Sequence, residues 1–232
     1  MPILGFSLAS LFNFPLEIAA GIILIGSSPS GLASNVMAYL AKANIALSVT
    51  LTAVATLLAP IMTPFLMKTL AGSFVPIDFL AMMTSIFKIV IVPVLLGLIF
   101  NYFFHGKAKW LDKAMPIISM AGIGFIIMII TAAGRDDLLS IGLLLILAAI
   151  IHNLLGYVFG YWGCRIFGMS EQDCRTIAFE VGMQNGGLAT GIALEMGKIS
   201  TVGLAPAIFG PWMNISGSSL ATWWRDKEPK KK

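Results

Sequence analysis

Charged side chains are scarce in this chain. Aspartate, glutamate, lysine and arginine make up only 11% of its 232 residues, whereas 58% of the residues are hydrophobic. Soluble globular domains carry about 25% charged residues, so the composition excludes that class. No soluble domain or long linker interrupts the apolar sequence. We therefore expect an all-α polytopic membrane protein, with membrane lipid around it and no nucleic-acid partner.

Cysteine and histidine are also rare, and their positions exclude further functions. Cys164 and Cys174 flank a polar loop and are too few for a disulfide framework or a metal site. Neither His105 nor His152 has the spacing of a zinc ligand or of a catalytic triad. No nucleotide-binding loop is present, which argues against an ATP-driven pump. Without a nucleophile–base pair, we expect no enzyme activity.

Long apolar runs dominate what remains. A membrane-spanning helix needs about 20 apolar residues. Polar residues, glycine and proline divide the chain into one partial span and seven full ones, at 1–13, 16–41, 44–70, 78–104, 114–133, 138–166, 172–197 and 201–224. Most of the 15 lysines and arginines fall on one side if the C-terminus is cytoplasmic. The pattern predicts an integral protein of a bacterial inner membrane with its C-terminus inside.

Two of these spans are interrupted by small and polar residues. Residues 26–36 read G-S-S-P-S-G-L-A-S-N-V, and residues 182–192 read G-M-Q-N-G-G-L-A-T-G-I. Broken helices at corresponding positions of two halves are the best sequence indication of a transporter's binding site. Each break exposes helix ends, whose amino termini favour anions and whose carbonyls favour cations.

Glu180 lies beside the second break, in apolar sequence. A charge within a span costs at least about 2.5–3.5 kcal/mol, so such residues are usually functional. Neutral oxygen-bearing side chains stand near one break or the other or on the adjacent span: Ser34, Asn35, Ser48, Thr52, Gln184 and Asn185. Hydroxyl, amide and carbonyl oxygens with one carboxylate suit a hard cation such as sodium. Two readings stay open: single hydroxyls that bond to their own helix, and a carboxylate that carries protons.

The same segments resemble the bile acid:sodium symporter family. The matching stretches are S-P-S-G-L-A-S-N-V (28–36), A-L-S-V-T-L-T-A-V-A-T-L-L-A-P (46–60), F-E-V-G-M-Q-N-G-G-L-A (179–189) and P-A-I-F-G-P-W-M-N (206–214). The resemblance covers essentially the whole chain. It implies a transporter built from two inverted five-span repeats, in which two discontinuous helices cross.

The resemblance also implies particular ligands, residue by residue. One sodium site would consist of Ser34, Asn35, Ser48, Thr52 and Glu180. Most of a second would consist of Glu180, Val181, Met183 and Gln184, with Met183 acting through its carbonyl. The organic anion would lie beside Asn185 and Asn214, and also beside Leu32, where the family commonly has a small hydroxyl residue, and Met213, where it often has histidine.

Compared with the family pattern, M-P-I-L-G-F looks like the middle of the third span. The resemblance therefore implies that the first two spans and part of the third are absent, together with a glutamine that would complete the second sodium site. Residues 1–70 would be the remnant of the first repeat, 71–224 the second repeat, and 225–232 a basic cytoplasmic tail.

The function expected from the sequence is sodium-coupled symport. The substrate would be a small organic anion, bile acid-like or a carboxylate such as pantoate or pyruvate, and no obligatory protein partner is evident. The alternatives are a non-transporting remnant, a membrane receptor and a proton-coupled antiporter. A glycine pair, Gly156 and Gly160, further predicts close packing of the span at 138–166 against a neighbour.

Overall fold

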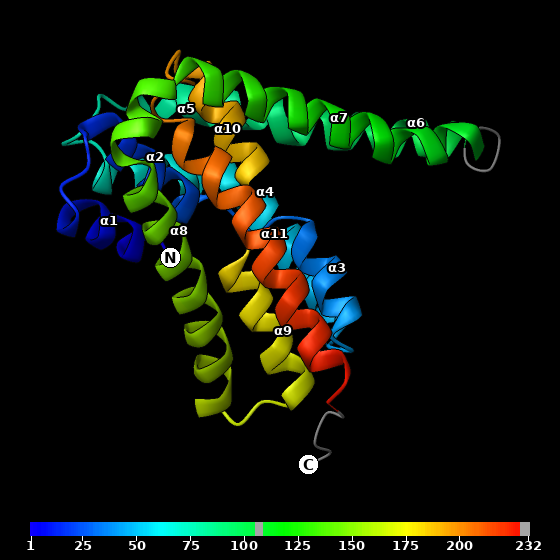
Figure 1. Cartoon of the computed structure of the whole chain (residues 1–232). Coiled ribbons are helices and arrows are strands. Elements are labelled where there is room, and N and C mark those ends of the chain that lie inside the picture. Colours follow the sequence, from blue (N-terminus) through cyan, green and yellow to red (C-terminus); the bar gives the residue numbers. More distant parts are fainter. Residues whose placement is uncertain (105–108, 228–232) are drawn as a thin grey trace.

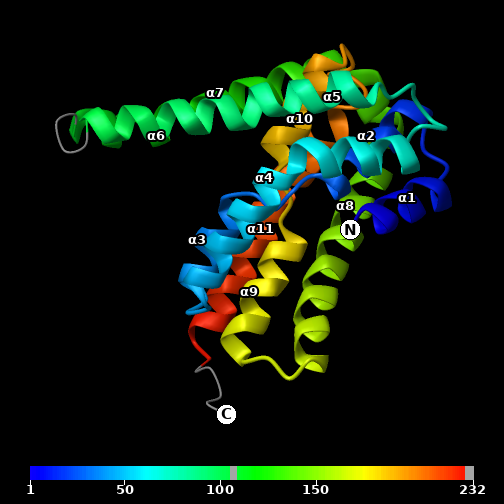
Figure 2. The same cartoon turned by 180° about the vertical axis from the view of Figure 1, so that it is seen from behind.

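The computed structural model describes residues 1–104 and 109–227, and their regular structure is helical (Figures 1 and 2). The expected all-α membrane architecture is confirmed. Within the described residues, three helical stretches are long and apolar enough to cross a membrane: Ile45–Leu70, Phe79–Phe100 and Arg135–Ile166. Most of the predicted basic tail, residues 228–232, lies outside the described residues, as does His105.

The first part of the chain forms a hairpin followed by a broken helix and a long one. Its helices are α1 (Pro2–Leu11), α2 (Leu16–Ser27), α3 (Ala33–Leu40) and α4 (Ile45–Leu70). The expected broken span at 16–41 is thus α2 and α3, separated by residues 28–32. Proline has no N–H and disfavours helical geometry in the preceding residue. Ser28, just before Pro29, is accordingly extended (ψ 149°), and α2 ends there.

The remainder of the chain contains the second broken helix. Its helices are α5 (Phe79–Ile86), η1 (Phe87–Ile91), α6 (Val92–Phe104), α7 (Lys109–Ala133), α8 (Arg135–Ile166), α9 (Glu171–Gly182), α10 (Gly186–Glu195) and α11 (Leu204–Arg225). The span expected at 78–104 is one continuous helical stretch with a π-helical turn in its middle, which the hydropathy pattern does not encode. α9 and α10 are the two halves of the broken span at 172–197.

Side-chain caps fix where several of these helices begin. The amide oxygen of Asn44 accepts from Leu47 N at 3.1 Å to begin α4, and that of Asn185 accepts from Leu188 N at 2.9 Å to begin α10. Such caps satisfy N–H groups that have no partner within the helix. The second helix break is therefore held open by a cap as well as by its glycines.

Close packing joins α8 to α9, as the glycine pair predicts. A Cβ at Gly160 would lie 2.6 Å from the carbonyl oxygen of Ile177, and one at Gly156 would lie 2.8 Å from Gly182 Cα. Only glycine allows the two backbones to approach so closely. This contact holds the helix that carries Glu180 rigidly against α8.

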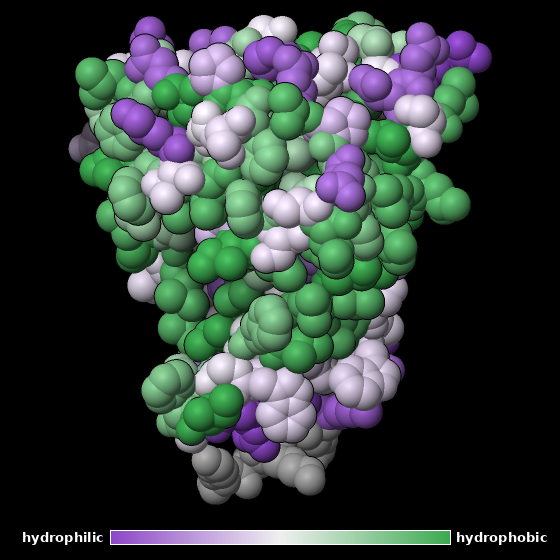
Figure 3. All heavy atoms as spheres, turned by 90° about the vertical axis from the view of Figure 1, so that its left-hand side faces the viewer, coloured by the Kyte–Doolittle hydropathy of each residue, from purple (hydrophilic) through white to green (hydrophobic). Residues whose placement is uncertain are grey.

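The molecule has a helical body from which α6 and α7 extend as an arm (Figures 1 and 2). α2 is the most buried helix of the body, with every residue from Ile18 to Ser27 buried. Apolar side chains cover the middle of the face in Figure 3, whereas hydrophilic residues gather toward its ends. This distribution matches the hydrocarbon layer and two aqueous borders of a membrane.

Candidate ion-binding site at the meeting of two helix breaks

The two helix breaks touch each other, although about 150 residues separate them. Gly31 N donates to the carbonyl of Met183 at 3.0 Å, and Asn185 N donates to the carbonyl of Pro29 at 2.7 Å. These bonds form an antiparallel bridge between residues 30 and 184. Backbone groups freed by a helix break need partners inside a membrane protein. Each break therefore supplies hydrogen-bond partners to backbone groups of the other, and the two breaks form one structural unit.

The Glu180 carboxylate lies beside this bridge, within reach of four hydroxyl groups. Ser30 Oγ donates to Oε2 at 2.7 Å, and Thr52 Oγ1 lies 2.9 and 3.1 Å from the two carboxylate oxygens. Ser34 Oγ and Ser48 Oγ lie 2.6 and 2.7 Å from Oε1. All four hydroxyl-bearing residues are buried, while Glu180 is partly buried. One carboxylate thus joins the first break, α3, α4 and α9.

The cluster contains more short oxygen–oxygen contacts than its four hydroxyl hydrogens can bridge. The amide oxygen of Asn35 lies 2.7 Å from Ser48 Oγ and 3.2 Å from Thr52 Oγ1, which also contact Glu180. Ser34 Oγ is likewise shared between the carboxylate and a backbone carbonyl at 2.8 Å. A hydroxyl has one hydrogen and cannot serve two acceptors fully. Several lone pairs therefore face each other, an arrangement that a hard cation would stabilise.

A second set of oxygens lies at the carboxyl end of α9. The carbonyl of Val181 accepts from the side chain of Gln184, and the carbonyl of Met183 accepts from the first break. Among the described residues, Gln184 Oε1 is buried without a partner. The carboxyl end of a helix carries partial negative charge. Carbonyl and amide oxygens thus gather at the carboxyl end of α9, in the residues that directly follow Glu180.

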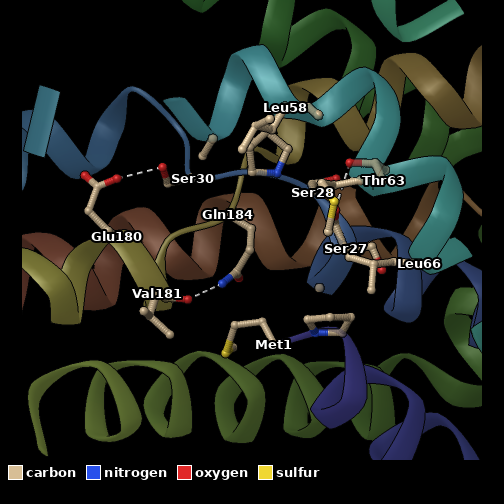
Figure 4. A pocket seen from close by; sticks show the side chains of 16 residues that line it. Met1, Ser27, Ser28, Ser30, Leu58, Thr63, Leu66, Glu180, Val181 and Gln184 are labelled. Atoms are coloured by element: carbon tan, nitrogen blue, oxygen red, sulfur yellow. Dashed lines mark hydrogen bonds between the residues drawn. The ribbon is translucent and has the colours of Figure 1, made fainter. Parts of the chain in front are cut away.

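Ser30, Glu180, Val181 and Gln184 border a cavity of about 350 Å³ (Figure 4). In the close-up, Glu180 points toward Ser30, and the Gln184 side chain turns back toward Val181. Other polar wall residues come from the end of α2, the first break and α4: Ser27, Ser28 and Thr63. The cavity connects the carboxylate to a space large enough for water or a small solute.

A buried polar chain fixes the end of α9 from behind. Asn153 Nδ2 donates to the carbonyl of Gly182 at 2.8 Å, while its Oδ1 accepts from Ser216 Oγ at 2.5 Å. The Tyr157 hydroxyl lies 3.1 Å from the same serine. Buried amides with both ends satisfied hold a single geometry. α8 and α11 therefore set the direction of the carbonyls that follow Glu180.

The four residues expected beside an organic anion have different surroundings. The Leu32 side chain is 76% exposed, and Asn214 is also exposed. Asn185 uses its side-chain oxygen to cap α10, and Met213 lies in the apolar core with 2% exposure. None of these four residues is among the described residues that line the 350 Å³ cavity. Their role in binding stays a prediction.

Sequence reasoning missed two groups at the site. Ser30 contacts Glu180 directly, and its position inside the S-P-S-G stretch was the available signal. Asn153 was detectable only as a polar residue in an apolar span. Its contact with Gly182 depends on how α8 packs against α9, which no local pattern specifies.

Comparison with known proteins gives this geometry a family. The model of the sodium bile acid symporter family matches residues 1–141. The uncharacterized sodium-dependent transporter YocS of Bacillus subtilis (strain 168) is 42% identical over 232 residues, which are 100% of this chain and 72% of that protein. The probable chloroplastic sodium/metabolite cotransporters BASS1 of Arabidopsis thaliana and Oryza sativa subsp. japonica are each 35% identical, over 99% and 100% of this chain. The chain spans 57% of the length of each of these plant relatives. The resemblance read from the motifs is confirmed, and the chain belongs to the sodium bile acid symporter family.

Proposed function

We propose that this protein takes part in sodium-coupled import of a small organic anion. The observation that carries the proposal is that the oxygens around Glu180, where the two helix breaks meet, make more short contacts with one another than their hydroxyl hydrogens can bridge. The relatives are named as a sodium-dependent transporter and as probable sodium/metabolite cotransporters, which supports the choice of sodium. A cation bound there would neutralise the carboxylate and reduce the electrostatic repulsion between the oxygen lone pairs.

Two ion positions share Glu180 in this proposal. The first uses the hydroxyl and amide groups of α3 and α4, namely Ser34, Asn35, Ser48 and Thr52. The second uses the end of α9, namely the carbonyls of Val181 and Met183 and the side chain of Gln184. Among the described residues, Gln184 Oε1 in this second set is buried without a hydrogen-bond partner, so this oxygen is free to bind a ligand.

The organic anion would bind near the amino ends of α3 and α10. These ends point N–H groups outward and carry partial positive charge, which suits a carboxylate such as pantoate or pyruvate, or a bile acid. Leu32, Asn185, Met213 and Asn214 are the residues of this chain that we assign to that contact. The exposed Leu32 favours a substrate with an apolar portion.

Ion binding would couple to movement because the ligands come from separate elements. A cation held by α3, α4 and α9 adds bonds that exist only when these helices are assembled. It therefore stabilises one arrangement over another by its differential affinity, as alternating access requires. In this proposal the two repeats are represented by residues 1–70 and 71–224. The protein would lie in a plasma membrane with its C-terminus on the cytoplasmic side.

The test compares two carboxylates in the 232-residue chain. Glu180→Gln removes the shared ligand charge, whereas Glu195→Gln changes a carboxylate on α10 whose recorded contact is an exposed hydroxyl, Ser85, at 3.4 Å. Purified variants are titrated with sodium chloride against potassium chloride, and the melting temperature is followed. Reconstituted vesicles then report uptake of labelled pantoate, pyruvate and taurocholate.

We expect sodium to stabilise the unmodified chain and Glu195→Gln but not Glu180→Gln. A ligand at ten times its dissociation constant adds about 1.4 kcal/mol of stability, which such melts resolve. Sodium stabilisation retained in Glu180→Gln would overturn the site. Uptake driven by a pH gradient without sodium would instead assign Glu180 to proton transfer.

A further inference from the structure

A second cavity, of about 430 Å³, lies at the far end of the molecule from the α6–α7 arm. It forms where α8 ends, α9 begins and α11 ends, close to the C-terminus in Figure 1. Its wall combines aromatic and charged side chains: Tyr161, Arg165, Glu171, Arg175, Trp223, Trp224 and Lys227. Nothing in the transport proposal uses this cavity.

Arg175 builds the floor of the cavity. Its side chain is 3% exposed and donates to the Glu171 carboxylate and to the backbone carbonyls of Ala41, Trp224 and Lys227, at 3.0–3.2 Å. A buried guanidinium needs these partners to offset the loss of water. Arg175 is therefore a structural cation, and its hydrogen bonds are committed to the protein.

The single carboxylate of the wall is also committed. Glu171 accepts from the Tyr161 hydroxyl at 2.8 Å and from Arg175 Nε at 3.1 Å, and Arg165 lies 3.7 Å away. These partners neutralise its charge locally. The wall holds three cations and one anion, so its net charge is 3 − 1 = +2.

Two cations remain available to a ligand. Within the described residues, the Arg165 side chain makes only the 3.7 Å ion contact, which is too long for a hydrogen bond. The Lys227 ammonium lies 3.5 Å from the ring centre of Trp223, a contact that leaves the N–H groups facing away from the ring able to donate. A guanidinium and an ammonium thus border one cavity with unused donors.

The cavity also lies where a membrane–water border is expected. Trp223 and Trp162, 54% and 60% exposed, stand near it at the ends of apolar helices α11 and α8. Tryptophan is typical of the headgroup level of a bilayer. On the α8 surface that leads away from this end, Val158 and Phe159 are exposed and apolar. Donors at headgroup level above an apolar surface match the two parts of a phospholipid.

We propose that this cavity binds the phosphate of an anionic glycerophospholipid. Arg165 and Lys227 donate to the phosphate oxygens, Trp223 covers the headgroup, and the acyl chains lie along the exposed face of α8. The site adds a specific lipid to the general membrane environment expected from the sequence. It does not depend on sodium or on the transported anion.

The test uses the 232-residue chain purified in detergent. Short-chain phosphatidylglycerol, short-chain phosphatidylcholine and inorganic phosphate are titrated separately. Native mass spectrometry counts bound lipid, and the change in intrinsic tryptophan fluorescence that Trp223→Phe removes reports on binding at the cavity. The variants are Arg165→Gln, Lys227→Gln and both together. The matched control is Arg135→Gln, whose 73% exposed side chain lies at the opposite end of α8.

We expect phosphatidylglycerol to bind more tightly than phosphatidylcholine by at least about fivefold. Each lost cation near a membrane surface weakens anionic binding about fivefold, so the double variant should lose roughly 30-fold while Arg135→Gln loses little. Arg165→Lys keeps the charge and should retain most of the binding, which separates recognition from folding. Lys227→Gln, at an exposed side chain, carries the test if the double variant does not fold.

Three results would overturn the proposal. Equal affinity for the two lipids would remove the role of charge. An unchanged affinity for phosphatidylglycerol in both Lys227→Gln and the double variant would show that Arg165 and Lys227 are not the donors. Inorganic phosphate that binds as tightly as phosphatidylglycerol would show a site for a free anion instead of a lipid.

Discussion

Replacement of Thr52 by valine tests the oxygen cluster by its smallest possible change. Valine keeps the branched shape of threonine but has no hydroxyl. Thr52 Oγ1 lies 2.9 and 3.1 Å from the two oxygens of Glu180 and 3.2 Å from the Asn35 amide oxygen, with the side chain buried. The substitution therefore removes one oxygen from the centre of the proposed ion site and leaves the packing volume nearly unchanged.

The expected magnitude follows from the charge of the partner. A hydrogen bond to a charged group contributes about 1.5–3 kcal/mol. Ser30, Ser34 and Ser48 still contact the carboxylate in the variant, so the lower value applies. We expect the sodium dissociation constant to rise about tenfold, which corresponds to roughly 1.4 kcal/mol.

Thr50 supplies the matched control on the same helix. Its hydroxyl is exposed and donates to the Ala46 carbonyl at 2.8 Å, within the helix. Both Thr→Val variants are melted across a sodium series in which potassium keeps the ionic strength constant. The sodium concentration at which stabilisation is half complete should rise in Thr52→Val and stay at the value of the unmodified chain in Thr50→Val. Equal midpoints in the two variants would refute the reasoning that places a cation among these oxygens.

Two further predictions concern the scaffold behind the site. Asn153→Leu leaves the Gly182 carbonyl without its donor, so it should lower the free energy of unfolding by about 1–3 kcal/mol. It should also weaken the stabilisation by sodium, measured by the same melts. A normal sodium response would show that Asn153 is only structural. Gly160→Ala should lower the free energy of unfolding by about 1–3 kcal/mol, because its Cβ would lie 2.6 Å from Ile177 O. Gly163→Ala, in open space on the same helix, is the control and should be close to neutral. Equal denaturation midpoints for these two variants would contradict the close α8–α9 packing.

Much of the fold was readable from local sequence because hydrocarbon imposes a simple rule. A continuous apolar run of about 20 residues is read as a helix, because a helix satisfies all its backbone hydrogen bonds within one segment in lipid. The broken spans were recognisable for the same reason: Pro29 and the glycines at 186 and 187 are poor helix formers inside otherwise continuous apolar segments. The π-helical turn at Phe87–Ile91 was not readable, because it changes neither hydropathy nor length.

The candidate site was predicted in part. Ser48 and Thr52 lie four residues apart, and that spacing alone places them on one face of α4. Ser30 was missed because extended residues at a break have no periodicity from which a direction could be inferred. The anion residues Leu32, Asn185, Met213 and Asn214 stay predictions, since their surroundings in the structure do not gather them around one space.

The sequence by itself determined that this is an all-α membrane protein with two interrupted helices and a carboxylate beside the second one. Composition and local breakers suffice for that, because they act over a few residues. Only the tertiary structure decided that the breaks meet, through bonds from Gly31 to Met183 and from Asn185 to Pro29. It also brought hydroxyls from three elements onto Glu180. Contacts across about 150 residues depend on how helices pack, which is a property of the whole chain and not of any segment.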